Sequence, residues 1–150
     1  MAFRWCLPWI LLFLLTALAE ASGWGQVLIG DRVAVTVEVA RTEAEKVRGL
    51  SGRQALPAGR GMLFVYEGPT RPVIWMRGMR FPLDILWIRD GRVVDLVRGA
   101  EPPAPGEEPQ VFAPRQEAQY VLEVSAGFVE RYGIVLDEPV RIHLEERRAE

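Results

Sequence analysis

One short run of residues constrains the fold more than any other part of the sequence. From Leu83 to Ile88 every residue is apolar except Asp84, so both faces of the segment are apolar. A run of this length with two apolar faces is typical of a central strand that is covered on both sides. The sequence therefore predicts a sheet with this segment inside it, and it places a carboxylate within the strand.

The segments around this run predict further strands and a short helix. Residues 33–39 alternate valine with smaller or polar residues, which indicates a strand with one buried face. Thr42 and Glu45 form a capping box that opens a helix, and Gly49 is the expected stop of that helix. Other strands are expected at residues 62–66, 73–77, 93–97, 119–124 and 139–144.

Turns and loops connect these strands. The Asp-Gly pair at 90–91 is a strong hairpin signal, and residues 67–70 also predict a turn. Residues 101–114 contain five prolines and no apolar periodicity, which predicts a surface loop. Ser125 is expected to cap a second short helix that ends at Gly133. Tight turns favour a single antiparallel sheet, curled or barrel-like, with two short helices, which is a β-rich α+β fold in one domain.

The first residues of the chain differ from the rest. Arg4 precedes residues 5–19, which carry no charge and would span about 22 Å as a helix, less than a bilayer core of ~30 Å. Small residues at signal-peptidase spacing follow, so residues 1–21 are expected to be a signal peptide, cleaved after Ala21 or Ala19. The alternative is an uncleaved anchor over residues 5–19. Either interpretation places residues 22–150 in the periplasm or outside the cell, with the signal segment as their only membrane contact.

The composition excludes several classes of site. The net charge is −2, so a nucleic-acid partner is not expected. Cys6 is the only cysteine and lies in the signal segment, which leaves the domain without a disulfide, a thiolate metal site or a cysteine nucleophile. His143 is the only histidine, and strand alternation places it on the polar, solvent-facing side of the last strand. The sequence predicts no metal site and no cofactor.

The buried carboxylate is the first candidate for a functional group. Burying Asp84 is costly unless the carboxylate is paired, protonated or open to solvent, and Arg77 and Arg80 are candidate partners. Two interpretations stay open. Asp84 either accepts backbone amides and fixes the turn at residues 78–81, or it lies at a cleft, where it binds a ligand or acts as an acid/base.

Residues just before this strand make the second interpretation specific. Trp75, Met76 and Arg77 bring an aromatic ring, a thioether and a guanidinium group close together, which is typical of binding surfaces. The candidate ligand-binding residues are therefore Trp75, Met76, Arg77 and Asp84, and Asp84 is the only catalytic candidate. Trp75 and Trp87 are also candidates for the core, because large aromatic residues on paired strands are usually buried.

Four blocks of sequence follow one another in a specific order and spacing. They are Val37-Glu38-Val39-Ala40 with Arg48-Gly49-Leu50, Leu56-Pro57 with Gly61-Met62-Leu63-Phe64-Val65-Tyr66, Trp75-Met76-Arg77 with Pro82-Leu83-Asp84-Ile85, and Tyr120-Val121-Leu122-Glu123-Val124 with Ala126-Gly127 and Gly133-Ile134. The blocks resemble the family catalogued as domain of unknown function 192, and the resemblance extends over about residues 33–144. Gly78-Met79 stands where that family usually has Asn-Thr. The resemblance implies a β-rich single domain and export, and it implies no activity.

Three functions stay open on this basis. The leading hypothesis is a binding or accessory module of the cell envelope, with a small molecule, a glycan or an envelope protein as its partner. The second is a hydrolase-type enzyme that uses Asp84 as acid/base, with Glu67 or Glu123 as the second carboxylate. The third is a structural or interaction domain, in which residues 75–85 only support the fold.

Overall fold

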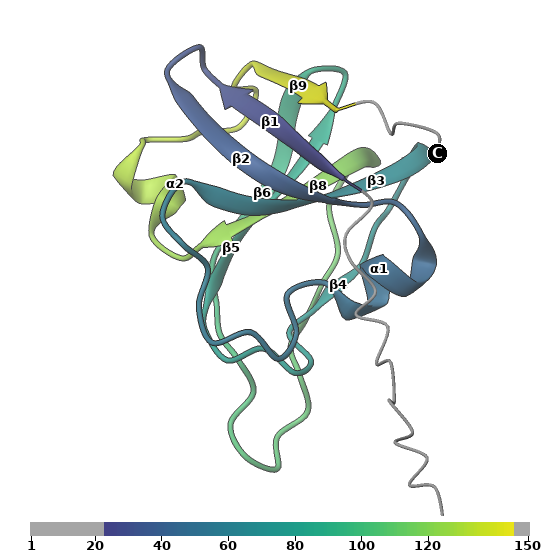
Figure 1. Ribbon diagram of the computed structural model, residues 1–150, viewed down its shortest axis with the longest axis vertical. Coiled ribbons are helices and arrows are strands. Elements are labelled where there is room, and N and C mark those ends of the chain that lie inside the picture. Colours follow the sequence, from purple (N-terminus) through teal and green to yellow (C-terminus); the bar gives the residue numbers. More distant parts are fainter. Residues whose placement is uncertain (1–22, 146–150) are drawn as a thin grey trace, which may run out of the picture.

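The structure is a computed structural model and describes residues 23–145, so the expected signal segment lies outside the described residues. Seven strands form one curled sheet in the order β6-β5-β8-β3-β2-β1-β9, and β4 and β7 form a separate two-stranded sheet (Figure 1). This β-rich architecture with two short helices confirms the fold class expected from the sequence. The elements are β1 (Trp24–Ile29), β2 (Val33–Ala40), α1 (Glu43–Arg48), β3 (Arg60–Thr70), β4 (Ile74–Trp75), β5 (Leu83–Arg89), β6 (Arg92–Ala100), β7 (Val111–Phe112), β8 (Ala118–Ser125), α2 (Phe128–Arg131) and β9 (Val140–Leu144).

Two features of the sheet were not predicted. Strand β1 pairs antiparallel with both β2 and β9. The sequence did not predict this strand, because Gly25 and Gln26 leave only a short aliphatic run after them. Strands β2 and β3 pair in parallel, so the expectation of an antiparallel sheet is wrong at this pair, although the other neighbours in the large sheet are antiparallel. A parallel pair needs a crossover rather than a tight turn, and residues 41–59 with α1 supply it.

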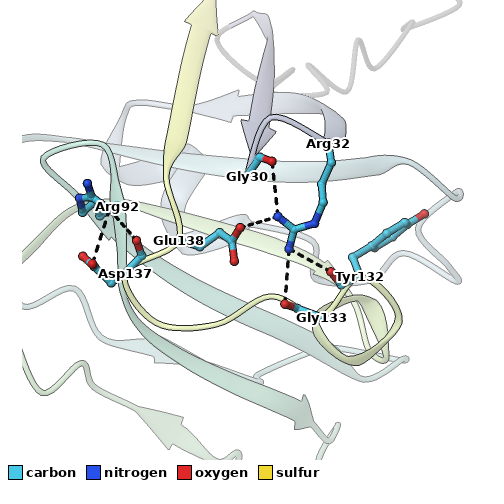
Figure 2. A network of polar contacts seen from close by, with 7 residues as sticks. All are labelled: Gly30, Arg32, Arg92, Tyr132, Gly133, Asp137 and Glu138. Carbon is cyan, nitrogen blue, oxygen red and sulfur yellow. Dashed lines mark hydrogen bonds and ion pairs between the residues drawn. The ribbon is translucent and has the colours of Figure 1, made fainter.

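The edges of the curled sheet meet at one end. The amide of Val140 donates to the carbonyl oxygen of Gly91 at 2.7 Å, and the amide of Val93 donates to the carbonyl oxygen of Glu138 at 3.0 Å. These bonds join β6 to the start of β9. Arg32, at the β1–β2 turn, donates to the Glu138 carboxylate and to the carbonyl oxygens of Tyr132 and Gly133 (Figure 2). These bonds fix the β1–β2 hairpin against the end of α2 and the segment before β9.

The large sheet buries both of its faces, and each face has its own core. The first core lies on the side of β1, β2, β9 and α2, and it contains Val27, Ile29, Val33, Val35, Val37, Val39, Leu63, Leu86, Ile88, Val93, Leu122, Val124, Val129, Ile134 and Val140. The second core lies on the side of the loop after α1 and of β4, and it contains Ala40, Leu50, Leu56, Met62, Phe64, Ile74, Met76, Met79, Leu83, Ile85, Trp87, Ala100, Ala118 and Val121. Strands β3, β5 and β8 contribute to both cores, which is why the apolar run at residues 83–88 has two apolar faces.

Strand β5 lies between β6 and β8, as a central strand should, and Asp84 within it is only 1% exposed. One carboxylate oxygen of Asp84 accepts from the amide of Gly99 at 2.9 Å and the other from the amide of Val129 at 2.7 Å. Backbone amides therefore hold this carboxylate, as one sequence interpretation expected. The amides belong to β6 and α2, however, so the expected anchoring of the turn at residues 78–81 is wrong.

Several local predictions are confirmed. The capping box of Thr42 and Glu45 is formed, and α1 ends at Gly49, where φ is +47°. The hairpin at Asp90 and Gly91 has positive φ at both residues, 49° and 68°, which an Asp-Gly pair adopts readily. His143 lies on the exposed side of β9 as expected.

Other local predictions are wrong. Strand β3 continues through residues 67–70, where a turn was expected, because a register shift against β8 absorbs the irregular sequence. The strand expected at 73–77 is reduced to Ile74 and Trp75, since Gly78 and the following turn interrupt the chain. Ser125 ends β8 and donates its hydroxyl to the Leu56 carbonyl oxygen, while Asp84 supplies the acceptor at the start of α2.

We expect Asp84→Asn to lower the free energy of unfolding by about 1–3 kcal/mol, because one of the two amides would then face an NH₂ group in place of a carboxylate oxygen. Urea unfolding followed by circular dichroism measures the change. Asp90→Asn is the control, because Asp90 is exposed and asparagine accepts its positive φ. Equal stability of the two variants would contradict an anchoring role for Asp84.

Candidate functional site

A pocket of about 340 Å³ opens on the side of the second core. Helix α1 and the residues after it form one wall, β3 and β8 of the large sheet form the floor, and β4 and β7 form the opposite wall. The volume lies within the range of pockets that bind small organic ligands. The lining residues are Glu43, Lys46, Val47, Arg48, Gly49, Leu50, Ser51, Phe64, Tyr66, Val73, Ile74, Trp75, Met79, Val111 and Glu123.

The walls of this pocket are held by specific contacts. Trp87 lies on the side of β5 that faces the second core. It donates its indole N–H to the Pro72 carbonyl oxygen at 2.9 Å and so anchors the segment before β4. The hydroxyl of Ser51 donates to the Arg77 carbonyl oxygen at 2.8 Å, which joins the loop after α1 to the turn after β4. The two walls are therefore fixed to the sheet and to each other.

Glu123 is the unusual residue of the pocket. It lies in the middle of β8, opposite Met62 of β3 and Ile85 of β5, and it is only 4% exposed. Strand alternation turns its side chain to the same face as Val121, toward the second core and the pocket. Within residues 23–145, no hydrogen bond or ion pair is formed by its carboxyl group. Burial raises the pKa of this group from 4.5 to about 8.

Aromatic rings surround the space above this carboxyl group. Phe64 and Tyr66 of β3 and Trp75 of β4 all line the pocket. The ammonium group of Lys46 lies 4.3 Å from the centroid of the Tyr66 ring and 3.0 Å from a carboxylate oxygen of Glu43. Burial, followed by the charges of Glu43 and Glu123, raises the pKa of Tyr66 to about 12. At neutral pH the Tyr66 hydroxyl therefore keeps its proton.

The mouth of the pocket is apolar and open to solvent. Four of the large hydrophobic residues that are exposed in this protein line it: Val47, Val73, Trp75 and Val111, at 60%, 57%, 43% and 61% exposure. Pairing of β4 with β7 places Trp75 opposite Val111. Exposed apolar residues gathered at a concave site mark binding surfaces more often than scattered ones do.

The structure separates the four residues that the sequence singled out as ligand-binding. Trp75 lines the pocket, whereas Met76 is fully buried in the second core. Arg77 is exposed outside the pocket, with its guanidinium group 5.5 Å from the centroid of the Trp75 ring. Asp84 faces the first core through its bond to Val129, so the sheet lies between Asp84 and the pocket. Their roles in ligand binding stay predictions.

From the sequence, Glu123 was considered only as a possible second catalytic carboxylate beside Asp84. The signal for its burial was present, because residues 120–124 are apolar on both faces except at Glu123, the same pattern that drew attention to Asp84. No sequence pattern indicated that Lys46 and Tyr66 belong to the same pocket. Their meeting with Glu123 depends on how α1 packs over β3, which the sequence pattern does not specify.

The described part of the chain offers neither a metal site nor a membrane-spanning helix. Among residues 23–145, no three His, Cys, Asp or Glu side chains lie together in a way that could hold a metal ion. In the same range, no helix has the length and apolar character needed to cross a membrane. The pocket over Glu123 therefore remains the candidate functional site.

Two solved structures are similar to this chain. A protein of unknown function from Novosphingobium aromaticivorans is 30% identical, with a TM-score of 0.71, and the match covers 77% of this chain and 83% of that one. A protein from Sinorhizobium meliloti that is proposed to be a transcription regulator is 26% identical, with a TM-score of 0.72, and the match covers 81% of this chain and 95% of that one. No protein with a curated description matches the chain.

A family model also matches the chain. The model is DUF192, described as "Uncharacterized ACR", and it matches residues 26–142. The match runs from β1 to β9 and includes the whole of the pocket. The chain therefore belongs to the DUF192 family, as its four sequence blocks indicated.

Proposed function

We propose that this domain is a binding module for a small organic molecule, which occupies the pocket over Glu123. The observation that carries the proposal is a carboxyl group that is nine-tenths buried, has no bonding partner within the described residues, and borders a pocket of about 340 Å³. The proposal gives the binding module expected from the sequence a definite site.

The energetics of Glu123 support a functional role. A buried polar group without a hydrogen bond costs free energy that a hydrophobic residue at the same position would not. The residues directly opposite Glu123, Met62 of β3 and Ile85 of β5, are apolar, so an apolar side chain at this position would have apolar neighbours. Binding sites commonly retain such destabilising groups because the ligand needs them.

The shape of the pocket supports a ligand with an apolar body. Aromatic rings line the interior, and Val47, Val73 and Val111 extend the apolar surface to the mouth. A ligand that covered these residues would remove exposed apolar area from water, which is favourable. A polar group of the same ligand would reach the carboxyl group of Glu123.

The proposed location is outside the cytoplasm, in the periplasm or the medium. It rests on the expected signal segment of residues 1–21, with its uncharged run and its small residues at peptidase spacing. The ligand would then be a molecule of the cell envelope or the surroundings. Retention on the membrane through residues 5–19 is the alternative.

The hydrolase hypothesis gains no specific support from the geometry. Both carboxylate oxygens of Asp84 accept backbone amides, and Asp84 and Glu123 lie on opposite faces of neighbouring strands. A glycosidase needs its two carboxyl groups on either side of one substrate bond. The third hypothesis is a structural domain without a ligand. It predicts that no fragment binds in the pocket.

The titration of Glu123 should appear in the stability of the protein. The pKa of Glu123 is about 8 in the folded state and near 4.5 in the unfolded chain, so the folded state holds the extra proton between these values. The contribution of Glu123 is complete below pH 4.5 and is lost as the pH rises to about 8, a change of about 3–5 kcal/mol. Urea unfolding at several pH values should show this loss in the wild type but not in Glu123→Gln.

Glu67→Gln is the control for this titration, because Glu67 is an exposed carboxylate on β3 outside the pocket. Its stability should follow that of the wild type at every pH. If the wild type and Glu123→Gln changed in parallel from pH 4.5 to 8, the carboxyl group of Glu123 would not be buried without a partner.

Replacement of the Trp75 ring tests the pocket itself. We expect Trp75→Ala to weaken the binding of aromatic fragments about tenfold, because the ring forms part of the pocket wall. Ligand-detected NMR of a fragment set measures the binding. Trp24→Ala is a matched control, since Trp24 is 42% exposed against 43% for Trp75, and each ring carries an arginine above it. Equal effects of the two substitutions would contradict binding in the pocket.

A further inference from the structure

We infer that the ligand of this pocket is an organic cation, a primary ammonium group on an apolar body, and that Glu123 is the counter-ion that receives it. This inference rests on the proposed function and specifies its ligand class. It starts from a carboxyl group at the pocket floor that receives no hydrogen-bond donor from residues 23–145. An ammonium group supplies three N–H donors together with the opposite charge.

Among residues 23–145, no positively charged side chain is paired with Glu123. The pKa of its carboxyl group is raised by burial, with no opposing effect from a cation. From α1, Lys46 is paired with Glu43 at 3.0 Å. Arg48, also from α1, acts on Glu38, where it adds to the larger effect of Arg53 in lowering the pKa of that carboxyl group.

The remaining elements around Glu123 bring no further charge to it. The neighbouring strands place Met62 and Ile85 directly opposite it, and neither can titrate. Tyr66 of β3 stays a neutral phenol, because its pKa is raised to about 12. Arg77, beyond β4, is exposed on the ring of Trp75 and lies outside the pocket lining. The place of a cation beside Glu123 is therefore left to a ligand.

The aromatic walls suit an ammonium group as well. Rings attract cations to their faces, and the attraction is larger where water is excluded. The protein already uses one ring of the pocket in this way, since the ammonium group of Lys46 lies 4.3 Å from the centroid of Tyr66. The ring of Phe64 also lines the pocket and has no cation partner among the described residues, whereas the ring of Trp75 carries the guanidinium group of Arg77 at 5.5 Å.

Binding of the cation would displace a proton. In the empty pocket at neutral pH the Glu123 carboxyl group holds its proton, because its pKa is about 8. When the ammonium group enters, the O–H bond breaks, the proton passes to the solvent, and the carboxylate accepts the N–H groups of the ligand. One proton is therefore released for each cation bound, and the affinity rises with pH, about tenfold per unit below pH 8.

Three probes of similar size separate the alternatives: benzylammonium, which is cationic, benzyl alcohol, which is neutral, and benzoate, which is anionic. Isothermal titration calorimetry at pH 6, 7 and 8 gives their affinities for the full protein. We expect benzylammonium to bind at least tenfold more tightly than benzyl alcohol at pH 8, and to lose about tenfold in affinity for each unit of lower pH. Titrations in two buffers of different ionisation enthalpy count the released proton in the wild type, without any substitution.

Two variants test whether benzylammonium binds at Glu123. Glu123→Gln should bind benzylammonium no more tightly than benzyl alcohol, with no dependence on pH and no proton released, because the amide carries no charge to pair with the ammonium group. Glu67→Gln is the control and should behave as the wild type, since its carboxylate lies outside the pocket.

The outcomes distinguish this inference from the proposed function. If benzyl alcohol or benzoate bound the wild type as tightly as benzylammonium, the pocket would bind small molecules but would not select cations, and the inference would be overturned. If none of the three probes bound at about 10 mM, both the inference and the proposed function would fail. Cation binding that was unchanged in Glu123→Gln would place the cation at another site and would also overturn the inference.

Discussion

The burial of β5 and β8 on both faces is the constraint on which the rest of the structure depends. These two strands are neighbours in the sheet, and their side chains supply the first core and the second core in alternation. Other elements cover these faces: α2 and the curled half of the sheet cover one, and the loop after α1 with β4 covers the other. The pocket lies where the second cover is incomplete, between α1 and β4.

Two buried carboxyl groups on these strands differ in their hydrogen bonding. Asp84 and Glu123 are both more than nine-tenths buried, and the residue opposite Asp84 on β8 is the immediate neighbour of Glu123. Asp84 receives two backbone amides and joins β6 and α2 to β5. Glu123 receives no donor from the described residues and borders open space. The two amides spare Asp84 the cost of an unpaired buried polar group, whereas Glu123 has no such compensation from the described residues.

The sequence predicted the fold better than the site, and the difference has a physical cause. Local patterns were enough for the central strand, for the capping box of Thr42 and Glu45, and for the Asp90 hairpin, because each depends on neighbours along the chain. Strand β1 and the acceptors of Asp84 depend on residues far apart in the sequence, so no local pattern revealed them. The same limit applies to the site. Trp75 was identified by its chemistry, but the meeting of Glu123 with Tyr66 and α1 follows from packing.

Direct titration of the Glu123 carboxyl group tests whether a buried and unpaired carboxyl group lies at the floor of the pocket. Carbon-13 NMR of the glutamate side-chain carboxyl groups, assigned by the signal missing in Glu123→Gln, follows the protonation of this residue alone. A midpoint at about pH 8 is the predicted result. A midpoint near the ordinary glutamate value of about 4.3 would show that Glu123 is solvated or paired in solution, and would contradict a binding site built on its unpaired carboxyl group.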